Sequence, residues 1–103
     1  MGLLEFLSKK EDTNIIREYL DNDAVIIDVR TTIEWNEGHI KKSTHITLNT
    51  IPASVDRIKA FEKPIIAVCK SGIRSQTAAD FLSKQGLDAI NGGAWQNVAQ
   101  FIG

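Results

Sequence analysis

The sequence contains a single cysteine, Cys69, and only two histidines, His39 and His45, among its 103 residues. One thiol cannot form a disulfide within the chain, and it cannot supply a zinc site that needs several thiolates. The histidines lie six residues apart, which is not the helical spacing of a metal-binding pair. We therefore predict structural roles for both histidines, no metal site, and a reducing compartment, most simply the cytoplasm.

The sequence also lacks an excess of charge of one sign and any long apolar run. The net charge is -1 at pH 7, and acidic and basic residues are mixed along the chain. This balance argues against a broad surface for nucleic acid or an anionic membrane, so we expect any anion binding to be local. No apolar stretch approaches the length of a membrane-spanning helix, and residues 1–12 do not resemble a secretory signal. We expect a soluble protein of one domain, residues 1–103.

What the sequence does contain is an alternation of apolar runs and helical patterns. Two continuous apolar runs, 24–28 and 64–69, are typical of strands covered on both faces. Residues 87–91 predict a last short strand, which Gly92 and Gly93 would close. The spacing of apolar residues predicts helices over 11–22, over 51–61, from Ile73 to a stop at Gly86, and over 94–102. Strands that alternate with helices imply an α/β fold with a parallel sheet and helices on both faces.

Cys69 ends the second apolar run and stands directly before the segment KSGIRS, residues 70–75. A thiol at this position meets backbone N–H groups and the positive end of a helix dipole, and both favour the thiolate. Most free cysteines are small core residues, but the glycine, the two hydroxyls and the two cations that follow are not what a buried strand end requires. We therefore interpret Cys69 as a reactive thiol.

A second group of polar residues follows the first apolar run. Ligands of an open parallel sheet bind beyond the carboxyl ends of its strands, so Asp28 and Arg30 should share one edge of the molecule with Cys69. We assign supporting roles to Asp28, as a partner of loop amides, and to Arg30, which would meet Glu34 across one helical turn. Trp35 is predicted to pack.

Three blocks of the sequence resemble the rhodanese-like sulfurtransferase family. They are DVRTTIEWNEGHI (28–40), CKSGIRS (69–75), which resembles the active-site loop of the family, and NGG (91–93). The resemblance extends from about Asp21 to the end of the chain. It implies a three-layer α/β sandwich with a mainly parallel central sheet and helices on both faces.

The resemblance also implies a chemistry, which is the transfer of a sulfane sulfur through a persulfide on Cys69, without a cofactor. Lowering a thiol pKa of about 8.5 by roughly two units would make the thiolate the major form at neutral pH. The expected partners are a small anionic donor, such as thiosulfate or a persulfide, and a thiol or cyanide acceptor. A sulfur-relay protein is a further partner that stays open.

The residues that follow Cys69 form the predicted substrate-binding loop. Lys70 and Arg74 are expected to guide an anionic donor, and Arg74 could make forked contacts to sulfonate oxygens, although Lys70 could also point simply to solvent. Gly72 tolerates a positive φ and lets the loop turn its amides toward the sulfur. The two serines are expected to donate to the loop or to cap the helix. The complete predicted loop is Lys70, Ser71, Gly72, Ile73, Arg74 and Ser75.

Two other functions stay open from the sequence alone. Cysteine phosphatases and arsenate reductases also place a cysteine before an arginine in an anion-binding loop. Four residues separate Cys69 from Arg74, one fewer than in the phosphatase signature, and the shorter loop favours sulfur over phosphate. The second alternative is a non-catalytic sulfur-relay or regulatory module, although inactive domains of this fold commonly lack the cysteine.

Overall fold

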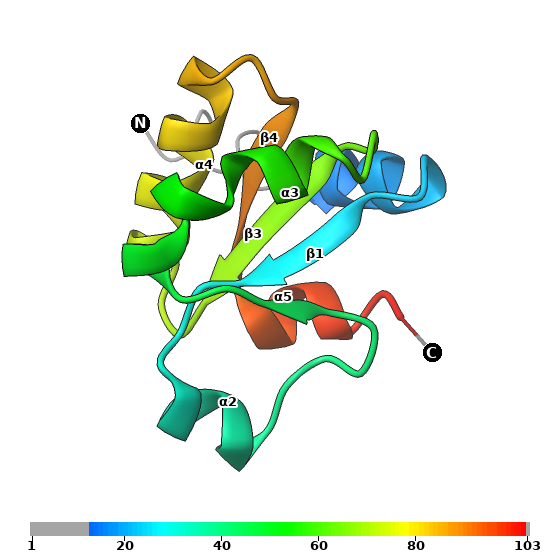
Figure 1. Cartoon of the computed structure of the whole chain (residues 1–103). Helices are drawn as coiled ribbons and strands as arrows, with labels where there is room; N and C mark the ends of the chain where they lie inside the picture. Colours follow the sequence, from blue (N-terminus) through cyan, green and yellow to red (C-terminus); the bar gives the residue numbers. More distant parts are fainter. Residues whose placement is uncertain (1–12, 103) are drawn as a thin grey trace, which may run out of the picture.

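A four-stranded parallel sheet forms the middle of the molecule (Figure 1). The computed structural model describes residues 13–102. The spatial order of the strands is β2-β1-β3-β4, and every neighbouring pair is parallel. The strands are β1 (Val25–Asp28), β2 (Thr44–His45), β3 (Ile65–Cys69) and β4 (Ala89–Ala94). The predicted α/β fold with a parallel sheet is therefore confirmed.

Helices cover both faces of the sheet, as Figure 1 shows. One face carries α3 (Val55–Lys59) and α4 (Ile73–Lys84), and the other carries the helical residues 13–21 and α5 (Trp95–Ala99). The remaining helix, α2 (Thr32–Glu37), lies beyond the carboxyl end of β1. None of the helices within the described residues has the length and apolar character needed to cross a membrane.

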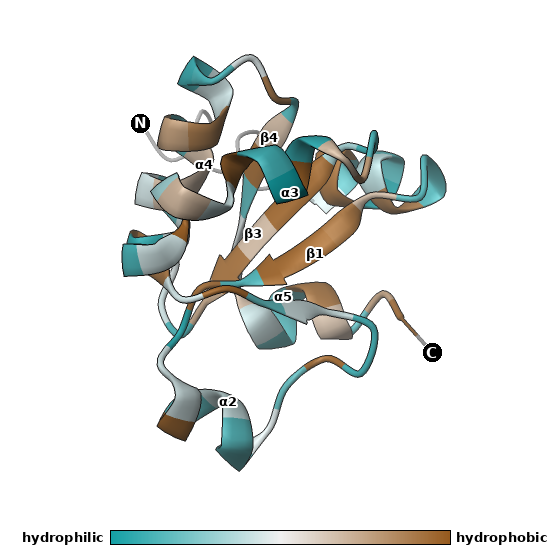
Figure 2. Ribbon diagram, viewed as in Figure 1, coloured by the Kyte–Doolittle hydropathy of each residue, from teal (hydrophilic) through white to brown (hydrophobic). Residues whose placement is uncertain are grey.

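The central strands are apolar on both sides (Figure 2) because each side packs against helices. Side chains alternate between the two faces along a strand, so neighbouring residues of β3 enter different cores. Ile66 and Val68 pack with Val98 of α5, whereas Ala67 and Cys69 belong to the core beneath α3 and α4. The alternation thus directs the thiol toward the side of the sheet on which α4 begins.

Several predicted elements differ from the structure, and the strand β2 was not predicted. The helix predicted over 94–102 is shorter, because β4 includes Ala94 and α5 ends at Ala99. The helix predicted over 11–22 is helical from 13 to 21, and positions 11 and 12 lie outside the described residues. The helix predicted over 51–61 is wrong as a continuous element, because a 3-10 turn, η2 (Pro52–Ser54), precedes α3. A second 3-10 turn of the same length, η1 (Leu48–Thr50), leads into η2, and its i to i+3 hydrogen bonds tighten the chain here.

Another difference is in β4, which runs through the glycine pair instead of ending before it. Ala67 of β3 pairs with Asn91 and Val68 pairs with Gly93, so Gly92 is an extra residue in a bulge. A Cβ atom on Gly92 would lie 2.6 Å from Ile66 Cγ2. Glycine therefore lets β4 continue in close contact with β3.

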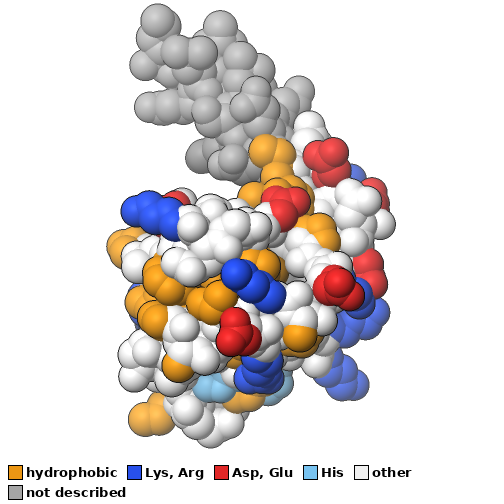
Figure 3. Space-filling model, turned by 45° about the horizontal axis from the view of Figure 1, so that its top comes forward, with side chains coloured by type: hydrophobic (Ala, Val, Ile, Leu, Met, Phe, Trp, Pro, Cys, Tyr) orange, Lys and Arg blue, Asp and Glu red, His pale blue; other side chains and the backbone are white. Residues whose placement is uncertain are grey.

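Charged side chains of both signs lie on the surface of the molecule (Figure 3). Positive and negative side chains are interspersed on the face that Figure 3 shows, without gathering by sign. The predicted single domain, residues 1–103, includes positions outside the described residues, so it stays a prediction. Residues 1–12, for which a secretory signal was not expected, also lie outside the described residues.

Candidate active site

Cys69 ends β3, and its Sγ atom is surrounded by donors from the loop that follows. The amide of Gly72 donates to Sγ at 3.0 Å and that of Ser75 at 3.4 Å, while the Ser75 hydroxyl lies 3.2 Å from the sulfur. Burial raises the pKa of the thiol, since Cys69 is fully buried. Hydrogen bonds from the Ser75 hydroxyl and from the amides of Ser75, Gly72 and Ser71 outweigh burial and hold the pKa below its ordinary value.

The backbone turns toward the sulfur at Gly72, which stands immediately before α4 with a φ of +98°. L side chains rarely adopt this conformation, and a Cβ atom here would lie 3.3 Å from Cα of Gly93. The residue that turns an amide toward the thiol is therefore also a point of close approach between the loop and β4.

Ser75 does not cap α4. The residue at the cap position is Gly72, which has no side chain to bond the free amides, and the Ser75 amide donates to the Cys69 sulfur instead. The Ser75 side chain is fully buried in the first turn of the helix and contacts Cys69 and Asn91 instead. Of the two roles considered for Ser75, the geometry supports contact with the loop sulfur.

Arg74 has a partner in the structure that the sequence did not indicate. Its two terminal nitrogens donate to the two carboxylate oxygens of Glu34, at 2.7 and 2.9 Å. This forked bond holds the pKa of Glu34 well below its usual range, together with hydrogen bonds from Thr31, and it raises the pKa of Arg74. Arg30 meets Glu34 across the helical turn as expected, but at the backbone carbonyl oxygen, because the Glu34 side chain turns toward α4.

Asp28 and Arg30 form a buried ion pair at the end of β1. Both carboxylate oxygens of Asp28 accept hydrogen bonds from the Arg30 side chain, at 2.8 to 3.1 Å. The guanidinium also donates to the carbonyl oxygens of Glu34 and Gly38 and lies over the ring of Trp95. Asp28 also accepts a hydrogen bond from the Arg30 amide. Because the guanidinium bonds both to Asp28 and to the Glu34 carbonyl, the pair links the end of β1 to α2.

Beside this pair, Trp35 packs between the two histidines. Its ring stacks on His39 and His45 with centroids 3.5 and 4.7 Å away. One ring nitrogen of each histidine bonds a backbone carbonyl, that of Trp35 for His39 and that of Arg30 for His45. In the part of the chain that the structure describes, no group of three or more potential metal ligands is present.

The remaining loop residues are at the surface. Lys70 and Ser71 are exposed, and Ile73 is 75% exposed although its side chain is large and apolar. Lys70 lines a cavity of about 210 Å³ together with Arg30, Glu34 and Trp95. This cavity is the space beside the loop in which a small donor could lie within reach of a cation.

Asn91 belongs to the site, and the sequence analysis did not identify it. Its side-chain oxygen accepts hydrogen bonds from Ser75 and from the Gly93 amide, and its nitrogen donates to the Gly72 carbonyl and to Gln76. The signal available was an amide in an otherwise apolar strand next to two glycines, because a half-buried amide requires partners.

The fold and the site define a parallel α/β protein whose only cysteine lies at the carboxyl end of a central strand, where loop amides surround its sulfur. A family model for the Rhodanese-like domain matches residues 12–98. The chain belongs to the rhodanese-like family, and this relationship supports sulfurtransferase chemistry at the level of the family.

Individual relatives agree with the family assignment. The chain is 32% identical to the "Putative sulfurtransferase YtwF" of Bacillus subtilis (strain 168), over 85% of this chain and 90% of that protein. A rhodanese-like domain protein from Staphylococcus aureus has a TM-score of 0.62 at 29% identity and covers 74% of each chain. The human single-domain sulfurtransferase, at 21% identity, supports the fold alone, with a TM-score of 0.66 over 84% of this chain and 91% of that one.

The ion pair between α2 and α4 predicts a specific pH dependence. Because the pKa of Glu34 is depressed in the folded protein, the pair contributes fully above the unfolded carboxyl pKa of about 4.3 and is lost as the pH falls below it. Glu34→Gln should therefore be less stable than the wild type at neutral pH, and the difference should narrow as the pH falls below about 4. Urea unfolding at a series of pH values measures this.

Glu37→Gln is the matched control, because Glu37 is an exposed carboxylate at the other end of the same helix. It should show little change at any pH. A difference between wild type and Glu34→Gln that is independent of pH would contradict the role assigned to the ion pair.

Proposed function

We propose that this protein transfers a sulfane sulfur from an anionic donor, thiosulfate or a persulfide, to a thiol or cyanide acceptor through a persulfide on Cys69. The observation that carries the proposal is the cradle of donors around Sγ, in which two amides and a hydroxyl lie within 3.4 Å of the sulfur. A group that alternates between thiolate and persulfide anion needs such donors in both states. The proposal requires no cofactor.

In the first half-reaction, the Cys69 thiolate attacks the sulfane sulfur of thiosulfate. A bond forms between Sγ and that sulfur while the sulfur–sulfur bond of the donor breaks, and sulfite leaves with the bonding electron pair. In the second half-reaction, the acceptor attacks the outer sulfur of the persulfide and the electron pair returns to Sγ. Negative charge lies at the loop throughout, so the amides of Gly72 and Ser75 stabilise every stage.

Approach of the donor is assigned to Lys70, because Arg74 is engaged by Glu34. Lys70 is the exposed cation nearest to Cys69 along the chain, and it lines the cavity beside the loop. The backbone amides of Ser71, Gly72 and Ser75 form the cradle, and Ile73 belongs to the loop that carries them. Asp28 and Arg30 keep their supporting role, since they hold the end of β1 and the start of α2.

The length of the loop argues against the phosphatase alternative, because four residues separate Cys69 from Arg74, one fewer than in the phosphatase signature. Two of the five N–H donors of Arg74 are also occupied by the Glu34 carboxylate. The non-catalytic relay module shares the persulfide and differs only in turnover. We also propose that the protein works in a reducing compartment, the cytoplasm, because its single cysteine acts as a thiol and forms no disulfide within the chain.

Intact-mass measurement tests the proposal. Incubation with thiosulfate should add one sulfur atom to the wild-type protein, and cyanide should remove it and form thiocyanate in repeated cycles. Cys69→Ser should gain no sulfur, because the carrier atom is missing. A wild-type protein that gains no sulfur from thiosulfate or from a persulfide would contradict the proposal, loading without turnover would favour the relay module, and release of phosphate from an aryl phosphate would favour the phosphatase.

A further inference from the structure

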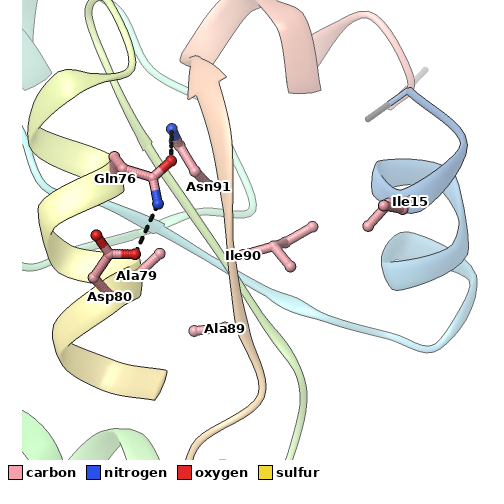
Figure 4. Close-up of a pocket in the computed structure, with 7 residues that line it drawn as sticks. All are labelled: Ile15, Gln76, Ala79, Asp80, Ala89, Ile90 and Asn91. Carbon is pink, nitrogen blue, oxygen red and sulfur yellow. Dashed lines mark hydrogen bonds between the residues drawn. The ribbon is translucent and has the colours of Figure 1, made fainter. Parts of the chain in front are cut away.

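A chain of hydrogen bonds runs from Cys69, past the edge of β4, to the exposed side of α4. The Ser75 oxygen lies 3.2 Å from Sγ, and the Ser75 hydroxyl donates to Oδ1 of Asn91 at 2.6 Å. Figure 4 draws the next two bonds, in which Nδ2 of Asn91 donates to Gln76 at 3.2 Å and Gln76 donates to Asp80 at 2.8 Å. The thiol is thereby connected to a surface carboxylate through three neutral side chains.

The orientation of the Asn91 amide follows from partners whose roles cannot change. The Gly93 amide can only donate and lies 2.9 Å from Oδ1, while the Gly72 carbonyl can only accept and lies 2.9 Å from Nδ2. The carboxylate of Asp80 orients Gln76 in the same way, because it can only accept. The oxygen of Asn91 therefore faces Ser75, and in this bond the Ser75 hydroxyl is the donor.

Ser75 has one hydroxyl hydrogen and two neighbours that can accept it. While the hydrogen points to Asn91, the Ser75 oxygen can only accept from Cys69, which suits a neutral thiol. A thiolate has no hydrogen to donate, and it gains the bond from Ser75 only if that hydrogen turns from Asn91 to Sγ. The thiol proton then leaves to solvent, and Asn91 keeps its bond from the Gly93 amide.

We propose that Asn91 is a positioning residue that competes with the sulfur of Cys69 for the hydroxyl hydrogen of Ser75, and so sets how readily the thiol ionises. The inference deepens the proposed function, because it concerns the same nucleophile. The direction of the bonds and the single hydrogen on Ser75 carry it.

Charged groups around Cys69 act alongside this competition and do not replace it. Arg74 of α4 attracts the charge on the sulfur, and its raised pKa reflects that attraction in part. Lys70 is the next residue of the loop, and Asp28 at the end of β1 is neutralised by Arg30. The strand β4 contributes no ionisable side chain, since its sequence is AINGGA. Substitution of Asn91 by a neutral residue therefore leaves the local charge unchanged.

The test is the rate at which iodoacetamide alkylates Cys69 as a function of pH. Asn91→Ala removes the competing acceptor, so the apparent thiol pKa should fall and the thiolate fraction below that pKa should rise about fivefold. Asn91→Asp places a stronger, charged acceptor at the same position, so the pKa should rise. This second variant keeps the size of the side chain and opposes the first in sign.

The decisive comparison repeats Asn91→Ala in a Ser75→Ala background. In that background there is no hydroxyl hydrogen for which Asn91 and the sulfur can compete. Asn91→Ala should then leave the thiol pKa nearly unchanged, because Asn91 acts on the sulfur through the Ser75 hydroxyl. Thr77→Ala is the matched control, since it deletes a hydroxyl that bonds to the Ile73 carbonyl on the exposed side of the same helix. It should not alter the alkylation profile.

The inference is overturned if Asn91→Ala raises the pKa, or if it lowers the pKa equally with and without the Ser75 hydroxyl. Alkylation requires only a thiol and no sulfur donor. A protein that shows the expected alkylation profiles but gains no sulfur from thiosulfate would contradict the proposed function and leave the competition between Asn91 and Cys69 standing.

Discussion

Arg30→Ala should lower the free energy of unfolding by about 3–5 kcal/mol, the cost of leaving a buried charge without its partner. Asp28 is fully buried, and Arg30 supplies most of its hydrogen bonds. The same guanidinium holds the Gly38 carbonyl at 2.7 Å, so its loss also releases the chain that follows α2. Urea unfolding at neutral pH measures the change.

A second ion pair in the molecule provides a control at the same distance. Lys63 Nζ lies 2.8 Å from Asp23 Oδ2, as Arg30 Nη2 does from Asp28 Oδ2, but Lys63 and Asp23 are largely exposed. Exposed pairs contribute about 0–1 kcal/mol, so Lys63→Ala should change stability little. If Arg30→Ala and Lys63→Ala lower the free energy of unfolding equally, burial is not the reason that the Asp28–Arg30 pair stabilises the fold.

Gly72→Ala should reduce the rate of sulfur loading from thiosulfate about 100-fold, an effect comparable to removing one donor from an oxyanion hole. At a φ of +98° an alanine is strained, and its Cβ would meet Cα of Gly93. The backbone must shift to relieve this, which moves the amide that lies 3.0 Å from the Cys69 sulfur. Loading of the protein can be followed by mass over time.

Gly86→Ala is the control that distinguishes backbone strain in general from displacement of the Gly72 amide. Gly86 has a similar φ, +86°, but it lies beyond the other end of α4, and a Cβ atom there would have no neighbour within 4 Å. Both substitutions should destabilise the fold by about 1–2 kcal/mol, and only Gly72→Ala should slow loading. Equal loading rates for the two variants would mean that the Gly72 amide does not act on the sulfur.

The framework of the fold followed from the sequence because the apolar runs were unambiguous. Residues 24–28 and 64–69 have the length and apolar character typical of strands buried on both faces, and they contain β1 and β3. The element ends were less accurate, since the i to i+3 hydrogen bonds around Pro52 and the bulge at Gly92 depend on how the chain packs. Apolar spacing reports which residues are buried, but not which turn joins them.

In the candidate site, too, features that depend on neighbouring residues were predicted, and contacts between distant residues were not. Cys69 at a strand end, before a glycine and a helix, was a local pattern, and the prediction that amides would surround the thiol needed nothing more. The partner of Arg74 was not local. Glu34 lies 40 residues away in the sequence, and nothing in the spacing of either residue indicated that α2 would carry it to the first turn of α4.

The sequence by itself determined the alternation of β1, β3 and β4 with helices, the family, and the single thiol that ends β3, because each of these depends on neighbouring residues. It did not reveal the short strand β2. Only the tertiary structure decided which polar groups meet at that thiol. It paired Arg74 with Glu34 and brought Asn91 of β4 against Ser75. The physical reason is that a hydrogen bond depends on distances of a few tenths of an ångström, which packing sets.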